Sequence, residues 1–544
     1  MNTRQLQTDK NQKLYHALLG ILLVCALAMM MLLSYWACKY SYYGAVDGRT
    51  RGVLVGDKTW AHIAVFFAAS LCTMGIDKVL MKKDKSQQEK ICLCTLIVTS
   101  VIAFILGVFY VCKNPYYPVG DQINTTAFAA YCRDGNFSML SIGGYVGMYQ
   151  QQKGLAILYE ILFTLFGDFN YRPAKILHVV WWILTILAGY GFLKLNTDRP
   201  VFRMLYCVMM LGCFPLLFYL PYIYGDVLSI SFGIILFYGV AAYEHSGQKR
   251  YIALASFAAG LAVLARKNTW IVLVAVAVYV LLVSLRKKKV RYLMAGTAIL
   301  LTAALSVKAV DVIYEVRSGY PSGVGIPSIL WVAMGLQETE GRAGVYNRYQ
   351  QATFTDYDCQ QELAAQQGKE YIRERLEEFS QDPGMAFNFF KNKVEGQWIE
   401  PMYAALESTE SFEEGAELSP VLESLYYGEL GRTIWKLTNY YQSILYLAGL
   451  MALVMLGILW WKKKEVPISL WLPWIAVFGG FLFSILWEAK SRYVFPYCVF
   501  MILYVPEGLY QTGLLLCKLP KLRKFKKSGH TQDKGEEASL RETA

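Results

Sequence analysis

Four short stretches of the sequence place charged side chains directly beside long apolar runs. A charge at membrane depth is costly, so such residues usually form a buried pair or belong to a site. A carboxylate can take a proton from a hydroxyl group, and arginine and lysine can hold a phosphate. Each charge alone fits an ordinary loop, whereas their collection at one membrane face favours a shared cavity. The charges are Asp121 in NPYYPVGDQ, Asp226 in LPYIYGD, Arg266 and Lys267 in ARKNTW, and Glu488 and Arg492 in WEAKSRY.

Asp121 is the candidate catalytic base. The prolines and Gly120 before it cannot continue a helix, so they are expected to turn the chain along the membrane face. Tyr116 and Tyr117 are expected to anchor that turn at the membrane interface. Gln122 adds no charge, so the carboxylate can act without a neighbouring acid.

The residues expected to bind substrate combine cations, carboxylates and aromatic rings. The cations would hold a phosphate, and tyrosine rings would stack on sugar faces at the headgroup level. Arg266 and Lys267 are the most informative cations because they lie at a turn where the charge rule of membranes disfavours them. The predicted binding residues are Lys153, Tyr222, Asp226, Arg266, Lys267, Glu488, Arg492 and Tyr493.

The elements that must position these residues are membrane-spanning helices. The chain has 544 residues, of which 55% are hydrophobic and 17% charged. Apolar runs of about 20 residues, enough for one crossing, recur along most of it. Because lipid cannot satisfy backbone polar groups, such runs must be helical. The sequence therefore predicts an all-α polytopic membrane protein.

Short basic blocks beside the apolar runs predict the topology. They account for much of the net charge of +12 and indicate cytoplasmic loops, with no nucleic-acid partner. The sequence then predicts a cell-membrane protein with twelve spans, both termini in the cytoplasm and the active site outside. The blocks are 82–90, 194–203, 248–250, 286–291, 461–465 and 518–527. The spans are 14–36, 59–80, 90–112, 174–194, 203–222, 224–243, 251–266, 268–285, 291–311, 438–461, 466–487 and 492–517.

Two long segments are expected outside the membrane. The first, 113–173, carries Asp121 and ends with a short apolar piece at 154–167 that we interpret as an interfacial or re-entrant helix. The second, 312–437, has 20 Asp and Glu against 10 Lys and Arg, which favours the same side. It includes an amphipathic helix pattern at 360–379 that ends at Asp382, so a small extracytoplasmic domain is predicted.

The remaining division of the chain follows from these segments. Residues 1–80 form an N-terminal transmembrane hairpin and 81–311 the transmembrane core. Residues 438–517 form the last spans, and 518–544 a basic and then disordered tail.

Metal binding has no clear signature. Most of the twelve cysteines lie in apolar runs, and the five histidines are scattered. Neither set has the spacing of metal ligands, so the cysteines are expected to be small buried side chains. The stretch DYD at 356–358 imitates a metal-binding motif inside an acidic segment.

Several motifs resemble a known family. NPYYPVGDQ, QQKGLAILYEILFTLFGDFNYRPAK, PYIYGD, ARKNTW, WVAMGLQETEGRAGVYN and WEAKSRYVFPY are similar to the bacterial GT-C membrane glycosyltransferases. That group includes protein O-mannosyltransferases and lipid A aminoarabinose transferases, and the resemblance covers roughly residues 90–510. It implies inverting transfer of a sugar from polyprenyl phosphate, with Asp121 as the catalytic aspartate. It also implies that Lys153 meets the lipid phosphate.

The chain also departs from that family. Two spans precede the one that leads to Asp121, so 14–80 is interpreted as an added hairpin. Gln122 stands where protein O-mannosyltransferases carry a second acid, so the acceptor remains open: a cell-envelope glycan, a lipid or a protein. The resemblance also leaves open a divalent cation, Mg²⁺ or Mn²⁺.

Two other functions fit part of the pattern. A polysaccharide polymerase or ligase would also use polyprenyl-linked sugars and a large external segment. A secondary transporter would match twelve spans, but the two halves of the chain show no similarity, whereas transporters usually contain repeats. A protein that binds the sugar lipid without catalysis is the third alternative.

Overall fold

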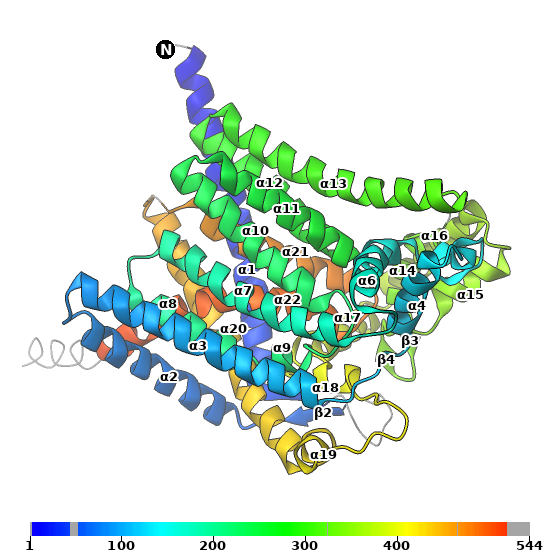
Figure 1. The fold of residues 1–544 in the computed structure, drawn as a ribbon. Helices are drawn as coiled ribbons and strands as arrows, with labels where there is room; N and C mark the ends of the chain where they lie inside the picture. Colours follow the sequence, from blue (N-terminus) through cyan, green and yellow to red (C-terminus); the bar gives the residue numbers. More distant parts are fainter. Residues whose placement is uncertain (1–2, 44–52, 324, 465, 519–544) are drawn as a thin grey trace, which may run out of the picture.

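The computed structural model describes residues 3–43, 53–323, 325–464 and 466–518. These residues form a bundle of long helices, with small helices gathered at one end (Figure 1). Ten helices of the described part are long and apolar enough to cross a membrane. The predicted tail, 518–544, lies outside the described residues except for Lys518. The ten are α1 (Thr3–Lys39), α2 (Thr59–Leu80), α3 (Lys85–Lys113), α7 (Arg172–Asn196), α10 (Asp226–Ser246), α12 (Trp270–Lys287), α13 (Val290–Ser318), α20 (Glu429–Trp461), α21 (Leu472–Leu486) and α22 (Ser491–Met501), whose span continues to Lys518.

The ten helices account for ten of the twelve predicted spans. The span expected at 251–266 is α11 (Lys249–Ala265), which has only 17 residues. The span expected at 203–222 is broken into α8 (Pro200–Leu211) and α9 (Phe214–Phe218). Pro215 lies in the first turn of α9, where its missing N–H costs little, but in a continuous helix it would remove a hydrogen bond. The count of twelve stays a prediction.

The long helices pack as one bundle. α10 packs against α7 and α11, α11 packs against α13, and α12 packs against α21. The predicted N-terminal hairpin contributes to the same core, because both of its helices, α1 and α2, pack against α20. Large side chains such as Trp182 and Trp474 are fully buried between the helices.

One end of the bundle collects the turns that carry the basic blocks. Arg203 and Lys194 both pair with Glu89, at 2.6 and 3.3 Å, and Arg199 pairs with Asp77 at 3.0 Å. These pairs tie the turn between α2 and α3 to the turn between α7 and α8.

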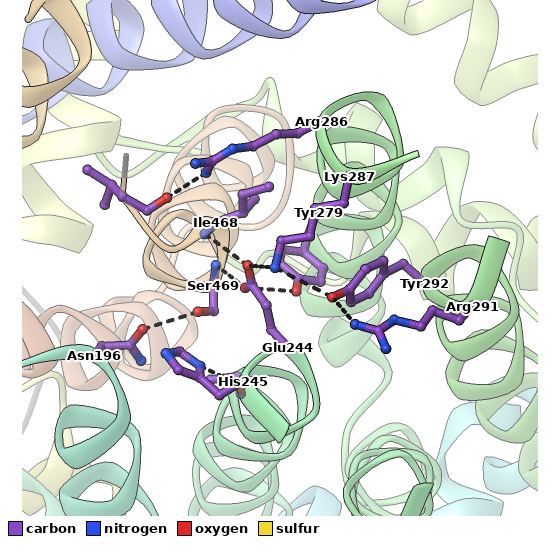
Figure 2. A network of polar contacts seen from close by, with 12 residues as sticks. Asn196, Glu244, His245, Tyr279, Arg286, Lys287, Arg291, Tyr292, Ile468 and Ser469 are labelled. Atoms are coloured by element: carbon purple, nitrogen blue, oxygen red, sulfur yellow. Dashed lines mark hydrogen bonds and ion pairs between the residues drawn. The ribbon is translucent and has the colours of Figure 1, made fainter. Parts of the chain in front are cut away.

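Glu244 lies at the centre of a second polar group at this end, which we call the Glu244 network. Its carboxylate accepts hydrogen bonds from Lys287 Nζ (2.8 Å), the Tyr279 hydroxyl (3.1 Å) and two backbone N–H groups. Those N–H groups belong to Ile468 (3.4 Å) and Ser469 (2.8 Å). Figure 2 shows the carboxylate placed between these donors. The network joins α10 and α12 to the turn before α21.

The opposite end carries the small elements (Figure 1). The amphipathic helix predicted at 360–379 is confirmed as α16, and Asp382 ends it and caps α17 by accepting from the Met385 N–H at 2.9 Å. The small elements are α4 (Asp121–Arg133), α5 (Tyr145–Met148), α6 (Lys153–Phe166), α14 (Ile329–Gly335), α15 (Tyr349–Asp356), α16 (Gln361–Gln381), α17 (Pro383–Trp398), α18 (Ala405–Ser408) and α19 (Pro420–Tyr427), with strands β1 (Tyr40–Tyr43), β2 (Val53–Gly56), β3 (Glu338–Thr339) and β4 (Arg342–Ala343).

The acidic segment is anchored in the bundle. Trp398, at the end of α17, is fully buried and donates its indole N–H to Ser484 Oγ at 3.0 Å. Its carbonyl accepts from the Tyr446 hydroxyl at 2.5 Å. α21 and α20 therefore hold the segment against the end of the membrane helices.

The short apolar helix is α6, with 14 residues. It lies along α13, held by the ion pairs Lys153–Asp311 (2.5 Å) and Glu160–Arg317 (2.6 Å). Its length is below that of a full crossing, as expected for an interfacial or re-entrant helix.

Candidate functional site

A cavity of about 1030 Å³ lies among the small elements and the turns between long helices. The turns are the one between α11 and α12 and the one between α21 and α22. The small elements include α4, α5, α14, α15, α17 and the strands β1, β2 and β4. Twelve of its lining residues are charged, eight are aromatic and seven are asparagine or glutamine. Of the residues predicted from sequence, Asp121, Arg266, Lys267, Glu488, Arg492 and Tyr493 line it.

Asp121 is the first residue of α4 and is exposed to the cavity. Gly120 precedes it with φ +58°, a conformation that favours glycine, so the tight turn predicted from the motif is confirmed. The Tyr145 hydroxyl donates a 2.7 Å hydrogen bond to Asp121 Oδ1. Burial and the nearby carboxylate raise the pKa of Tyr145, so the phenol stays protonated as a donor. Asp121 is therefore oriented but still open to a ligand.

The turn before Asp121 is anchored differently from the expectation. Tyr116 is fully buried rather than placed at a membrane interface. Its carbonyl accepts from Lys175 Nζ at 2.8 Å, and its hydroxyl donates to Gln122 Oε1 at 2.7 Å. The sequence showed two aromatic residues next to a span but not the buried lysine that holds one of them.

Asp226, Arg266 and Arg492 form a buried group that we call the arginine cluster. Arg266 pairs with Asp226 Oδ1, and Arg492 Nε lies 3.9 Å from the same oxygen. This approach requires Gly225, since a Cβ there would lie 1.9 Å from the Ala265 carbonyl oxygen. Asp226 is 2% exposed and does not appear among the described residues that line the cavity. It therefore positions the two arginines rather than contacting a ligand.

The cluster is incompletely paired. Arg266 Nη2, Arg492 Nε and Asp226 Oδ2 are buried and have no hydrogen-bond partner among the described residues. Buried polar groups in proteins nearly always have a hydrogen-bond partner, so these unpaired atoms need a physical explanation. Because both arginines line the cavity, an anion there would supply the missing acceptors.

Tyrosine rings support the cations. The Arg492 guanidinium lies 5.2 Å from the Tyr222 ring centroid and 5.4 Å from that of Tyr493. Arg266 lies 5.2 Å from the Tyr493 centroid. These are cation–π distances. Tyr222 thus acts beneath Arg492, outside the cavity, whereas Tyr493 contributes to its wall.

Glu488 is 7% exposed and accepts from the Tyr493 hydroxyl at 3.3 Å. Burial raises the pKa of Glu488 to about 7. The carboxyl group can therefore hold or release a proton near neutral pH.

Lys393 and Glu400 are two of the titratable lining residues that sequence reasoning missed. Lys393 of α17 is 1% exposed, and its Nζ donates to the Gly335 carbonyl. Burial lowers the pKa of Lys393 to about 7, against the opposing effect of Glu488. Glu400 accepts from the N–H groups of Met402 (2.8 Å) and Ala404 (2.5 Å), while burial raises its pKa to about 7. Lys393 lies four residues after Phe389, on the apolar face of α17, and this was the available sequence signal.

Lys153 does not join the group. It is 2% exposed, pairs with Asp311 and donates to Ser322 Oγ at 2.9 Å. It does not appear among the described residues that line the cavity. Its position fits a clamp between α6 and α13 and gives no support to phosphate binding there.

No divalent cation has a ready ligand set here. In the described part of the chain, no three His, Cys, Asp or Glu side chains gather in a way that could hold a metal ion. Asp356 and Asp358, from the DYD stretch, lie at the end of α15 and are not among the described lining residues. The residues present therefore do not fit an Mg²⁺ or Mn²⁺ site, and we derive no step through one.

No family model, curated protein or solved structure matches the chain. The residues of the cavity therefore carry the functional argument.

Proposed function

We propose that the protein is a GT-C-type membrane glycosyltransferase that moves a sugar from polyprenyl phosphate to a hydroxyl group with inversion. One observation carries the proposal. Two buried arginines with unpaired nitrogen atoms line the same cavity as Asp121, a carboxylate open to a ligand. An anion site and a candidate base in one cavity, at the end of membrane-spanning helices, suit a lipid-linked phosphate donor and a hydroxyl acceptor.

The proposed reaction needs one base and no covalent intermediate. The acceptor oxygen forms a bond to the anomeric carbon while its proton passes to Asp121. The bond between that carbon and the phosphate oxygen breaks, and its electron pair leaves with the polyprenyl phosphate. Because the leaving phosphate gains charge, Arg266 and Arg492 stabilise the transition state more than the bound donor. The Tyr145 hydroxyl keeps Asp121 oriented toward the cavity.

The proposal includes the predicted topology, with twelve crossings, cytoplasmic termini and an extracytoplasmic cavity. It takes α8 with α9 as one broken crossing and α11 as a short one. Two observations support it: the basic turns lie together at one end, and the acidic segment lies at the other (Figure 1). This charge asymmetry follows the positive-inside rule.

Asp121→Asn tests the proposed base. The amide keeps the shape and the contact with Tyr145 but cannot accept a proton, so transfer should fall about 10²–10⁴-fold. Donor binding and thermal stability should stay near those of the unmodified protein. The measurement is consumption of a radiolabelled polyprenyl-phosphate monosaccharide by the purified protein in lipid nanodiscs.

Asp134→Asn is the matched control, since Asp134 lies at the other end of α4 and is exposed. Full activity of Asp121→Asn would move the base to Glu488, the next lining carboxyl to test. Consumption only of a diphosphate-linked oligosaccharide would indicate a polymerase or ligase. Movement of substrate across the membrane without consumption would indicate a transporter.

A further inference from the structure

An aromatic strip runs along the cavity wall away from Asp121. It consists of Tyr145, Tyr149, Trp331 and Trp487, all of which line the cavity. Consecutive ring centroids are 5.1, 6.2 and 5.9 Å apart, and the two indole planes differ by only 3°. The strip begins at the residue that donates to Asp121 and ends beside Glu488. A ligand lying on it would therefore present one end to the candidate base.

Gln350 places an unpaired hydrogen-bond acceptor in the cavity wall. It is 1% exposed and lines the cavity, yet its Oε1 has no hydrogen-bond partner within the described residues. A buried carbonyl oxygen accepts and never donates, so only an O–H or N–H donor can satisfy it. An anion cannot. This demand differs from that of the two unpaired arginine nitrogen atoms, each of which needs an acceptor.

The composition of the wall fits a hydroxyl-rich ligand. Seven asparagine and glutamine side chains line the cavity, and each amide offers both donors and an acceptor. Gln152 already donates to the Tyr224 hydroxyl at 2.6 Å. A lipid tail would leave most of the other amide groups unpaired, which is costly. Flat aromatic faces can pack on the C–H faces of sugar rings while the amides pair with the hydroxyl groups. The volume, about 1030 Å³, lies at the upper end of ordinary ligand sites, so it has room for more than one sugar.

We propose that the aromatic strip and Gln350 form the acceptor subsite and that the acceptor is a saccharide. The inference rests on the proposed function. A hydroxyl oxygen of the bound saccharide forms the new bond to the anomeric carbon, and its proton passes to Asp121. The bond to the phosphate oxygen breaks with its electron pair on the polyprenyl phosphate. A serine or threonine of a protein is the competing acceptor.

Binding to the Asp121→Asn protein tests the subsite without turnover. The probes are maltotriose, mannotriose, cellotriose, chitotriose and a threonine-containing peptide, measured by calorimetry in lipid nanodiscs, because glycosidic detergents would compete. At least one saccharide should bind saturably and the peptide should not. Trp331→Leu and Gln350→Leu should each weaken that binding at least tenfold. Tyr346→Ala, at an exposed lining position, gives a third variant if either of those fails to fold.

Trp461→Leu and Gln381→Leu are matched controls, because both residues are exposed and neither is among the described lining residues. Binding of the peptide alone, of no saccharide, or equal binding by the variants and the controls would overturn the inference.

Donor hydrolysis without acceptor separates this inference from the proposed function. Introduced with Asp121 intact, the Trp331 and Gln350 substitutions should lower transfer to the saccharide at least tenfold more than they lower slow hydrolysis. Equal loss of both activities would place these residues in the donor site and overturn the inference. Failure of the unmodified protein to consume donor would overturn the proposed function, while the saccharide titration would still decide the binding site.

Discussion

Two buried charged groups lie at opposite ends of the helical bundle, and their polar atoms are paired to different extents. In the Glu244 network both carboxylate oxygens are paired, each with a side-chain donor and a backbone N–H (Figure 2). In the arginine cluster, Arg266 and Arg492 each keep a nitrogen without a hydrogen-bond partner in the described part of the chain. Both groups lie at the ends of α10.

The pairing of buried polar atoms distinguishes the structural Glu244 network from the arginine cluster. A fully paired buried network rigidifies the elements that it joins. A buried cation without acceptors is costly in the free protein and is tolerated where a ligand completes it. The number of unpaired atoms separates the Glu244 network from the arginine cluster better than burial does, since Glu244 and Arg266 are both 9% exposed.

The largest expected effect is all-or-none and concerns the two sides of the membrane. A cysteine placed at Gln381, in the acidic segment, should react with an impermeant reagent in intact cells. A cysteine placed at Lys289, in a basic turn, should react only after permeabilisation. Cys359 should be replaced by serine in both variants, because it lies in the acidic segment and is partly exposed. Reaction of both positions in intact cells would contradict the twelve-span topology.

Glu244→Ala should break the paired end. It leaves Lys287 and two backbone N–H groups without their acceptor, so the free energy of unfolding should fall by about 3 kcal/mol. Glu244→Gln should lower the free energy of unfolding by less, because the amide oxygen still accepts hydrogen bonds. Thermal unfolding in nanodiscs measures both, with Glu414→Ala, at an exposed position, as the control. An unchanged melting temperature for Glu244→Ala would contradict a structural role for the Glu244 network.

Arg266→Ala should weaken donor use about 10- to 100-fold at limiting donor, which corresponds to the loss of a charged hydrogen bond. Arg266→Lys should recover only part of this activity, because lysine lacks the planar fork. Donor titration of transfer measures both variants. Arg266→Ala leaves the Asp226 carboxylate with only the more distant Arg492 among the described residues, and this loss of a partner can itself destabilise the fold. The thermal midpoints of both variants should therefore be compared with that of Asp226→Asn. Full activity of Arg266→Ala at limiting donor would assign the phosphate to Arg492.

Substitution of Lys393 should give the smallest effect, which is a change in how thermal stability depends on pH. Burial lowers the pKa of Lys393 from 10.5 to about 7, so between these values the unfolded chain binds more protons than the folded chain. Stability should therefore rise with pH across that window. Lys393→Met should reduce this rise, so that the change in melting temperature between about pH 7 and pH 9 becomes a few degrees smaller than in the unmodified protein.

Two neighbouring carboxyl groups act below that window. Burial raises the pKa values of Glu488 and Glu400 to about 7, so their contribution to stability falls as pH rises toward 7. Measurements above pH 7 thus reduce the opposing contribution of these two carboxyl groups. Parallel pH profiles for Lys393→Met and the unmodified protein would contradict a neutral buried lysine.

The sequence predicted those features that depend on local pattern. Apolar runs located the long helices, and helical periodicity with Asp382 located α16 and its end. The proximity of charged turns also followed, because alternating crossings bring every second turn to the same end. Asp121, Arg266 and Glu488 accordingly meet in one cavity.

What the sequence could not provide depends on partners distant in the chain. Lys153 seemed suited to phosphate, but its partner Asp311 lies 158 positions away and fixes it outside the cavity. Asp226 was expected to bind substrate, yet it neutralises Arg266. Pro215 gave a local warning that the span at 203–222 would break, which hydropathy alone overlooked.

The two subsites meet at the turn between α21 and α22, which carries Trp487 and leads to Arg492, and they differ in their remaining walls. The arginine cluster comes from turns between long helices, whereas Trp331 and Gln350 belong to α14 and α15. Under the proposed function, exchange of the short stretch 328–351 would alter acceptor choice without touching the base or the phosphate contacts. Substitutions confined to this short segment would therefore change the product, and engineered chimeras can exchange it as one piece.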